Sequence, residues 1–92
     1  MAYIYIIGST IKPYKIGITK NPNQRLKSLQ TGHPNKLNIL YKDEVPDDKV
    51  RYLEKVIHST INYSRTKGEW FNIELEEAIN EIKYAKMRYL KD

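Results

Sequence analysis

The sequence contains no cysteine, and its first 42 residues contain no aspartate or glutamate. The lack of cysteine excludes disulfide scaffolds and zinc sites built on thiolates. No apolar run is long enough to span a membrane, and the short apolar stretch Ala2–Ile7 has no basic residue before it, unlike a signal peptide. We therefore expect one soluble domain over residues 1–92 with no membrane partner. Its expected location is the cytoplasm, or the nucleus or host-cell interior if the protein is viral.

The missing acids make the distribution of charge uneven. Residues 1–42 contain seven lysines or arginines, whereas the remaining 50 residues contain nine bases and eleven acids, within a net charge of +5. A positively charged half indicates a polyanionic partner such as nucleic acid. A solvated lysine-rich surface is the alternative, and charge alone does not choose between them.

Three segments are predicted to be strands. Tyr3–Ile7 alternates aromatic and β-branched residues, and Tyr14–Ile18 follows after a connection of five or six residues, which predicts a hairpin. Leu37–Val45 also alternates well enough to be a strand. The residues expected on one face of this third strand are Leu37, Ile39 and Tyr41.

Three helices are predicted from their end signals and apolar spacing. The first begins near Pro22, with Asn21 as its N-cap and Gln24 in the capping-box position, and it stops at Gly32. The second begins at Pro46-Asp47-Asp48, and the third begins near Glu74.

The segment Glu69–Ile73 is expected to return to the sheet or to pack on its end. The order of elements predicts an α+β domain with a small central mixed or antiparallel three-stranded sheet flanked by helices.

Glu54 and His58 form the clearest candidate site in the acidic half. Both lie beside the apolar stripe of the second helix, one turn apart on the same side, so that a carboxylate and an imidazole are neighbours. This pairing suits a metal or general acid-base site, whereas an ordinary salt bridge is the commoner outcome for such a pair.

Five elements in order resemble the GIY-YIG nuclease superfamily. They are Tyr3-Ile4-Tyr5, Lys15-Ile16-Gly17, Arg25, Glu54 within a Leu-Glu-Lys run, and the segment Gly68-Glu69-Trp70-Phe71. The similarity is strongest to the compact phage- and virus-associated branch of this superfamily, and it extends from residue 2 to about residue 75.

The resemblance implies a role for four residues. Tyr5 would activate the attacking water or accept its proton, and Arg25 would contact the scissile phosphate. Gly17 would allow a close approach of strand, helix and substrate. Glu54 would bind one divalent metal ion, Mg²⁺ or Mn²⁺. On the sequence alone, a strand tyrosine packed in the core is the better interpretation of Tyr5, and a surface arginine is the alternative for Arg25.

Two positions depart from the family signatures. Tyr3 stands where the superfamily has glycine, and Lys15 stands where it has tyrosine. The lysine is expected to lower the pKa of Tyr5 or to hold the phosphate. Tyr14 should face the opposite side of its strand and is not expected to replace the missing phenol.

The resemblance to the superfamily also bears on the two histidines and on two asparagines in the second half of the chain. His58 belongs to the pattern of this branch and is given a secondary catalytic or metal-ligand role. His33 is expected to contact substrate, or else to be an exposed loop histidine. Asn62 and Asn72 both stand near the family's late asparagine, and neither is assigned a role.

Four further lysines are expected to form a phosphate-binding surface around the first helix, without contacts that read base sequence. They are Lys12, Lys20, Lys27 and Lys36. The resulting hypothesis is a divalent-metal-dependent DNA endonuclease that acts as a monomer or homodimer. The alternatives are a catalytically inactive nucleic-acid-binding or adaptor domain of the same fold, and a nuclease directed at RNA.

Overall fold

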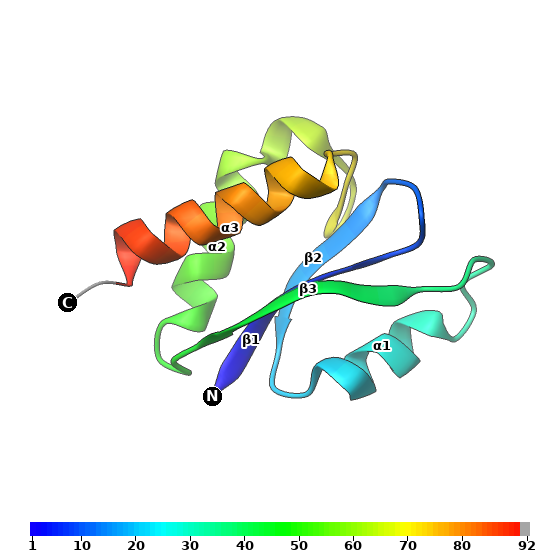
Figure 1. Ribbon diagram of the computed structural model, residues 1–92, viewed down its shortest axis with the longest axis horizontal. Coiled ribbons are helices and arrows are strands. Elements are labelled where there is room, and N and C mark those ends of the chain that lie inside the picture. The colour runs from blue at the N-terminus through cyan, green and yellow to red at the C-terminus, as the bar shows by residue number, and fades with distance from the viewer. Residues whose placement is uncertain (91–92) are drawn as a thin grey trace.

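The structure is a computed structural model that describes residues 1–90, so the last two residues of the predicted domain lie outside the described residues. It contains five strands, three α-helices and one short 3₁₀ helix, which Figure 1 shows as a sheet between helices. In chain order these are β1 (Ala2–Gly8), β2 (Tyr14–Thr19), α1 (Pro22–Gln30), β3 (Asn38–Val45), α2 (Val50–Thr60), η1 (Asn62–Ser64), β4 (Arg65–Lys67), β5 (Trp70–Phe71) and α3 (Leu75–Tyr89).

The predicted α+β class is confirmed, but the sheet has five strands in the order β3-β1-β2-β5-β4, not three. All neighbouring strands are antiparallel. The expected return of the segment Glu69–Ile73 to the sheet is confirmed by β5, which pairs with β2, whereas β4 was not predicted. The two short strands form a hairpin in which Gly68 has a φ of +57°, a left-handed conformation that favours glycine. With three and two residues, β4 and β5 are too short for alternation to be detected in the sequence.

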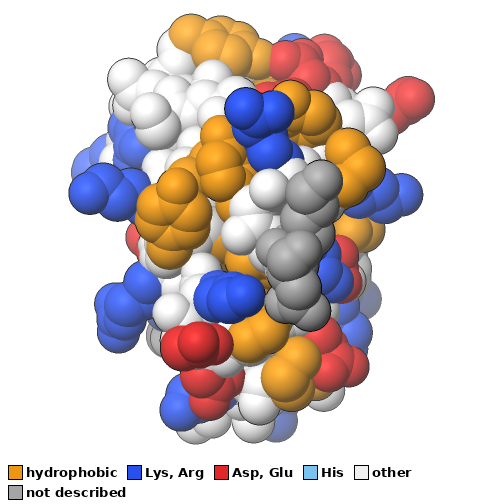
Figure 2. Space-filling model, turned by 90° about the vertical axis from the view of Figure 1, so that its left-hand side faces the viewer, with side chains coloured by type: hydrophobic (Ala, Val, Ile, Leu, Met, Phe, Trp, Pro, Cys, Tyr) orange, Lys and Arg blue, Asp and Glu red, His pale blue; other side chains and the backbone are white. Residues whose placement is uncertain are grey.

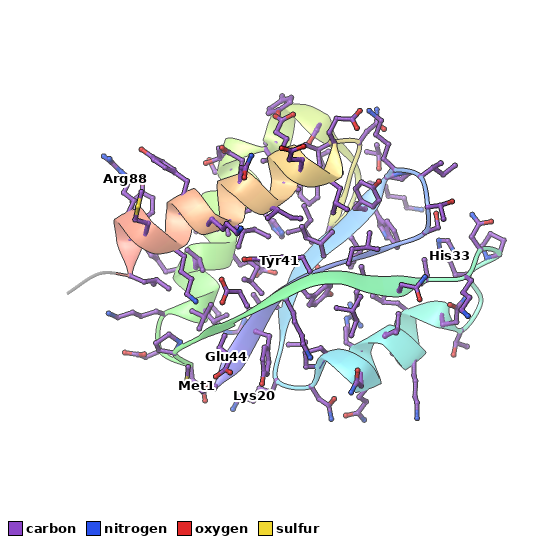
Figure 3. The ribbon with its side chains drawn as sticks, viewed as in Figure 1. Met1, Lys20, His33, Tyr41, Glu44 and Arg88 are labelled. Atoms are coloured by element: carbon purple, nitrogen blue, oxygen red, sulfur yellow. The ribbon has the colours of Figure 1, made fainter. Side chains whose placement is uncertain are left out.

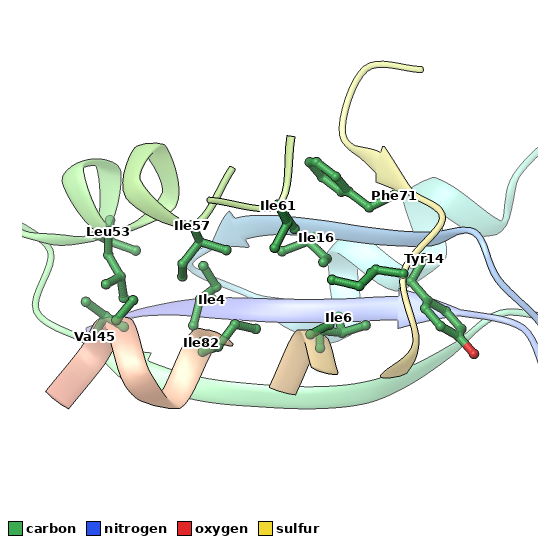
Figure 4. Close-up of a cluster of buried hydrophobic side chains, with 14 of the residues drawn as sticks. Ile4, Ile6, Tyr14, Ile16, Val45, Leu53, Ile57, Ile61, Phe71 and Ile82 are labelled. Carbon is green, nitrogen blue, oxygen red and sulfur yellow. The ribbon is translucent and has the colours of Figure 1, made fainter. Parts of the chain in front are cut away.

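Helices cover both faces of the sheet, with α2 and α3 on one face and α1 on the other (Figure 1). The larger core lies under α2 and α3, where Ile4, Ile6 and Ile16 of the sheet meet Leu53, Ile57 and Ile82 (Figure 4). The smaller core lies under α1 and contains the buried side chains of Tyr5, Ile7 and Leu37. Period-two alternation along β1 therefore sends Ile4 and Tyr5 into different cores.

The prediction that Leu37, Ile39 and Tyr41 share one face is wrong at Tyr41. The pairing of β1 with β3 shifts register, so that Ile7 faces Ile39 but its neighbour Ile6 faces Tyr41. This β-bulge inserts one extra residue and moves Tyr41 to the core under α2 and α3, whereas Ile39 packs in the core under α1.

The start of α1 agrees with its predicted cap. The side chain of Asn21 accepts a hydrogen bond from the Gln24 backbone N–H at 3.1 Å. The reciprocal half of the capping box differs, because the Asn21 N–H donates to the Thr19 hydroxyl at 3.2 Å. After the helix, Gly32 has a φ of +80°, as expected for a residue that ends a helix.

The predicted start of α2 at Pro46-Asp47-Asp48 is wrong by several residues, because α2 begins at Val50. The preceding residues form a turn in which the Lys49 N–H donates to the Pro46 carbonyl at 3.0 Å. Asp47 does not lie in the first turn of α2. Its carboxylate lies 3.5 Å from the amino terminus and 3.6 Å from Lys20 Nζ.

Seven large apolar side chains of the described residues are exposed outside these cores. Figure 2 shows one end of the molecule, where hydrophobic side chains alternate with basic and acidic ones. The exposed large side chains of α2 and α3 include Tyr52, Tyr84 and Met87. Within residues 1–90, no helix is both long enough and apolar enough to cross a membrane.

Candidate catalytic and metal site

Tyr5 and Gly17 face each other across the pairing of β1 with β2. Tyr5 is almost fully buried, with 1% of its side chain exposed. A Cβ atom on Gly17 would lie 2.7 Å from the Tyr5 hydroxyl oxygen and 3.0 Å from Glu69 Oε1. The missing side chain therefore lets the phenol of Tyr5 and the carboxylate of Glu69 both approach the same point of the β2 backbone.

Arg25 reaches this phenol from the other side. It lies on the face of α1 that is turned toward the sheet, and its Nε donates a hydrogen bond to the Tyr5 hydroxyl oxygen at 3.2 Å. Burial raises the pKa of Tyr5 above its ordinary value of 10.0, while Arg25 acts in the opposite direction. The charges of Glu69 and Glu54 also raise this pKa, so both carboxylates lie within electrostatic range of the phenol.

Glu54, His58 and Glu69 form the second half of the site. Each offers one ligand atom, and these three atoms all lie within 4.8 Å of one another. All three residues are half-buried. Burial is the main cause that raises the pKa of Glu54, and the neighbouring Glu69 raises it further. The predicted proximity of Glu54 and His58 is confirmed, and Glu69 joins them from the turn between β4 and β5.

Glu69 is a candidate site residue that sequence reasoning missed. Its only signal was its place in the string Gly-Glu-Trp-Phe, which carried the resemblance without indicating a role. The structure brings it to the site because β5 pairs with β2, which places the preceding turn beside Gly17.

His58 is fixed by a backbone carbonyl at the edge of β2. Its Nε2 lies 2.8 Å from the Ile16 oxygen, and a carbonyl can only accept, so Nε2 carries the proton of this hydrogen bond. The Ile16 N–H donates to the Glu69 carbonyl at 3.1 Å. The two-residue strand β5 is too short to pair with the Ile16 carbonyl oxygen as well, so that oxygen is available to His58. This arrangement leaves His58 Nδ1 as the nitrogen with a free lone pair.

Lys15 lies next to Glu69, where its Nζ is 3.5 Å from Oε1. Only 13% of the lysine side chain is exposed. Lys15 is not among the groups that shift the pKa of Tyr5, which burial raises. Its alternative role, holding the phosphate, stays a prediction. Tyr14 packs in the core under α2 and α3, which confirms that it faces away from the phenol of Tyr5 (Figure 4).

The four lysines of the predicted phosphate-binding surface are not equivalent. Lys12 lies 2.6 Å from Glu74 and Lys20 lies 3.6 Å from Asp47, so carboxylates accompany both. Lys27 and Lys36 are exposed, on α1 and in the connection that follows it.

His33 lies at the far end of α1 from Lys20 (Figure 3). Its ring is half-buried and stacks on Trp70, with 5.5 Å between ring centres and 24° between planes. The Asn35 N–H donates to His33 Nδ1 at 3.2 Å. His33 is therefore part of an ordered aromatic pair and not a freely exposed loop histidine.

Asn62 and Asn72 lie just before β4 and just after β5, and both make contacts within this part of the chain. The side-chain oxygen of Asn62 accepts a hydrogen bond from Arg65 at 2.9 Å. The backbone N–H of Asn72 donates to the Ser64 carbonyl at 2.7 Å, and this residue is exposed.

The site thus combines a phenol held by a guanidinium with two carboxylates and an imidazole, beside the two central strands β1 and β2. This is a small α+β domain whose architecture is compatible with a nuclease-like fold. The chain belongs to the T5orf172 domain family, whose model matches residues 2–86. That domain is associated with phages and is related to nuclease-like folds. No curated protein and no solved structure matches the chain.

Proposed function

We propose that this domain is a divalent-metal-dependent endonuclease of GIY-YIG type that hydrolyses phosphodiester bonds of DNA. The observation that carries this proposal is the convergence on Gly17 of the Tyr5 phenol and the Glu69 carboxylate. Arg25 and the pair Glu54 and His58 complete the set, so that groups from β1, α1, α2 and the β4–β5 turn meet at one place. Membership of a phage-associated, nuclease-like family supports the same conclusion.

Each of the groups would have a distinct task. The phenol of Tyr5 would take the proton of the attacking water, within reach of its guanidinium partner. Nε of Arg25 is occupied by the phenol, which leaves its two terminal NH₂ groups for the charge that develops on a phosphate. Lys15 would add a second cation on the Glu69 side of the phosphate.

The residues present fit a divalent cation. Two carboxylates and an imidazole offer ligand atoms within 4.8 Å of one another, and the charge of Glu69 adds to burial in raising the pKa of Glu54. Glu54 and Glu69 would hold the ion through oxygen, and His58 would offer Nδ1 while Ile16 fixes its ring. The ion would supply Lewis-acid stabilisation of phosphate oxygens and of the leaving group.

The donor set also distinguishes between metals. Both Mg²⁺ and Mn²⁺ bind carboxylate oxygens. Mg²⁺ strongly prefers oxygen ligands, whereas Mn²⁺ tolerates an imidazole nitrogen better. We therefore expect Mn²⁺ to support cleavage at lower concentration than Mg²⁺. His58→Ala should reduce this preference, because it removes the only nitrogen ligand of the set.

A nicking assay on supercoiled DNA tests the enzymatic proposal. Glu54→Ala should abolish cleavage with Mg²⁺ or Mn²⁺ and leave DNA affinity largely intact, because it removes a metal ligand and no basic side chain. Glu44→Ala is the matched control, since Glu44 is an exposed carboxylate on β3. Full activity of Glu54→Ala, purified in parallel with wild type, would refute the assignment.

A second candidate function is nucleic-acid binding without turnover. It is favoured by Lys15, which stands where the family signature has a tyrosine and is paired with Glu69. The same assay separates the two functions, because a binding domain retains DNA yet nicks none of it with either metal. Labelled DNA and RNA strands of one sequence, compared side by side, identify the preferred substrate.

A further inference from the structure

We propose that a cavity beside the candidate active site is a subsite for one unpaired nucleobase of a DNA strand. This inference rests on the proposed function and names the form of substrate that the site would take. The cavity has a volume of about 210 Å³ and lies between the β1–β2 connection and the segment that follows α1. Its lining residues are Ser9, Ile11, Lys12, Pro13, His33, Asn35, Leu37 and Trp70.

The lining has the planar and apolar surfaces that bind a base. Trp70 and His33 form an offset stack, with 5.5 Å between their centres, and a third flat ring in the cavity would extend it. Leu37 is buried and forms the floor, whereas Ile11 leaves 68% of its surface to solvent. Stacking of bases on such aromatic side chains is the usual means of binding single strands.

The size and polarity of the cavity also suit a single base. Its volume is below the roughly 300 Å³ at which pockets for drug-sized ligands begin. Ser9 and Asn35 offer hydrogen-bonding groups, and Lys12 adds an ammonium group that is paired with Glu74. An adjoining cavity is lined by Lys36, and none of the residues lining either cavity is acidic. This composition favours an aromatic ring attached to a phosphate chain.

Lys15 connects the subsite to the carboxylates. Trp70 follows Glu69 directly in the chain. The Nζ atom of Lys15 lies 3.5 Å from the Glu69 carboxylate and 5.9 Å from the centre of the Trp70 ring. A phosphate held by Lys15 would therefore have its neighbouring base beside the indole.

The position of the subsite limits the substrate. A base inside a duplex is stacked on both faces, so it must leave the helix before it can enter the cavity. We therefore expect cleavage next to unpaired nucleotides, such as those of flaps, gaps, mismatches and single strands, in preference to continuous duplex.

Trp70 is the only tryptophan in the chain, so its fluorescence reports on the subsite directly. The experiment titrates the wild-type protein in EDTA with a short oligothymidylate, with its fully abasic analogue, and with a strand that has one central abasic position. We expect base-dependent quenching and binding roughly 5- to 150-fold weaker to the strand in which every base is replaced by an abasic site. A single abasic position should give an intermediate loss.

Variants test the same subsite without removing the reporter. His33→Ala should weaken quenching and binding of oligothymidylate, because it removes one ring of the stack, whereas Tyr84→Ala on α3 should change neither. Equal quenching and affinity for oligothymidylate and its fully abasic analogue would overturn the proposal. So would an unchanged affinity in His33→Ala.

These experiments distinguish failure of the base subsite from failure of the proposed nuclease function. Base-dependent quenching in EDTA without any nicking in metal would support the subsite and refute the nuclease. Metal-dependent nicking at equal rates on duplex and flapped DNA, without base-dependent quenching, would support the nuclease and refute the subsite.

Discussion

Arg25 Nε donates a hydrogen bond to the hydroxyl oxygen of Tyr5 at 3.2 Å, across the interface between α1 and the sheet. The partners are 20 residues apart in the chain and come from different elements. The bond leaves the phenolic proton free to point elsewhere, because the oxygen accepts. It therefore positions the phenol and also leaves it able to exchange a proton with water.

Tyr5→Phe should abolish cleavage while leaving the fold intact. The substitution removes the proton acceptor but keeps the ring in the core under α1, and general-base catalysis contributes about 10²- to 10⁴-fold. Nicking rates and circular dichroism measured on the same preparation check both parts. Cleavage at the wild-type rate would show that another group activates the water.

Arg25→Lys should lower the cleavage rate about 10²- to 10³-fold, the usual effect of removing one donor of an oxyanion-stabilising group. An ammonium cannot bond the phenol and present a planar pair of donors to a phosphate at the same time. Arg51→Lys is the matched control, because this arginine is exposed on α2. An equal loss in both variants would indicate a general effect of charge instead.

The cleavage rate should rise with pH over the whole range from about pH 7 to pH 9. The pKa of Tyr5 is raised above 10.0 by burial, so the phenolate fraction increases about tenfold for each pH unit below that value. Single-turnover rates in saturating metal provide the measurement. A plateau that begins near neutral pH would contradict a role of this phenol as the base.

Glu54→Gln should stabilise the metal-free protein at pH 7. The folded-state pKa of Glu54 is raised above 4.5, so the ionised carboxylate costs stability as pH rises through that folded value. Below about pH 4 the Glu54 side chain is protonated and neutral like glutamine, so the difference in stability between wild type and Glu54→Gln should vanish. Thermal melts in EDTA at the two pH values check this prediction, and equal melting temperatures at pH 7 would contradict it.

Saturating metal should reverse this order of stability. At a concentration 100 times its Kd, Mn²⁺ would stabilise the wild type by about 2.7 kcal/mol. In a domain of this size that corresponds to a rise in Tm of roughly 10–20 °C. The Glu54→Gln variant should gain much less, and an equal gain would place the metal elsewhere.

Gly17→Ala should destabilise the protein by about 1–3 kcal/mol, as overpacking does elsewhere. The added Cβ would lie 2.7 Å from the Tyr5 hydroxyl oxygen and 3.0 Å from Tyr5 Cζ. Tyr5→Phe should rescue part of the loss, because it removes the nearer of these atoms. A double-mutant cycle of thermal melts measures this coupling, and strictly additive effects would refute it.

Much of the fold follows from local signals in the sequence. The hairpin of β1 and β2, the N-cap of α1 at Asn21 and the buried stripe of α2 depend on residues close in sequence, so alternation and capping predict them. The failures occurred where longer-range contacts act. The bulge that moves Tyr41 is a property of two paired strands. The return of Glu69–Ile73 to the sheet was expected, but β4 was not, because it exists only through its pairing with β5.

The same division applies to the site. The sequence by itself supplied the candidate Glu54 through the scarcity of acids, and the candidates Tyr5 and Arg25 through the resemblance to GIY-YIG signatures. Only the tertiary structure decided that Glu69 joins Glu54, and that His33 stacks on Trp70. These contacts join residues that are far apart along the chain. They form because strand pairing and helix packing bury apolar surface, and the polar groups at the margins of the two cores are brought together as a consequence.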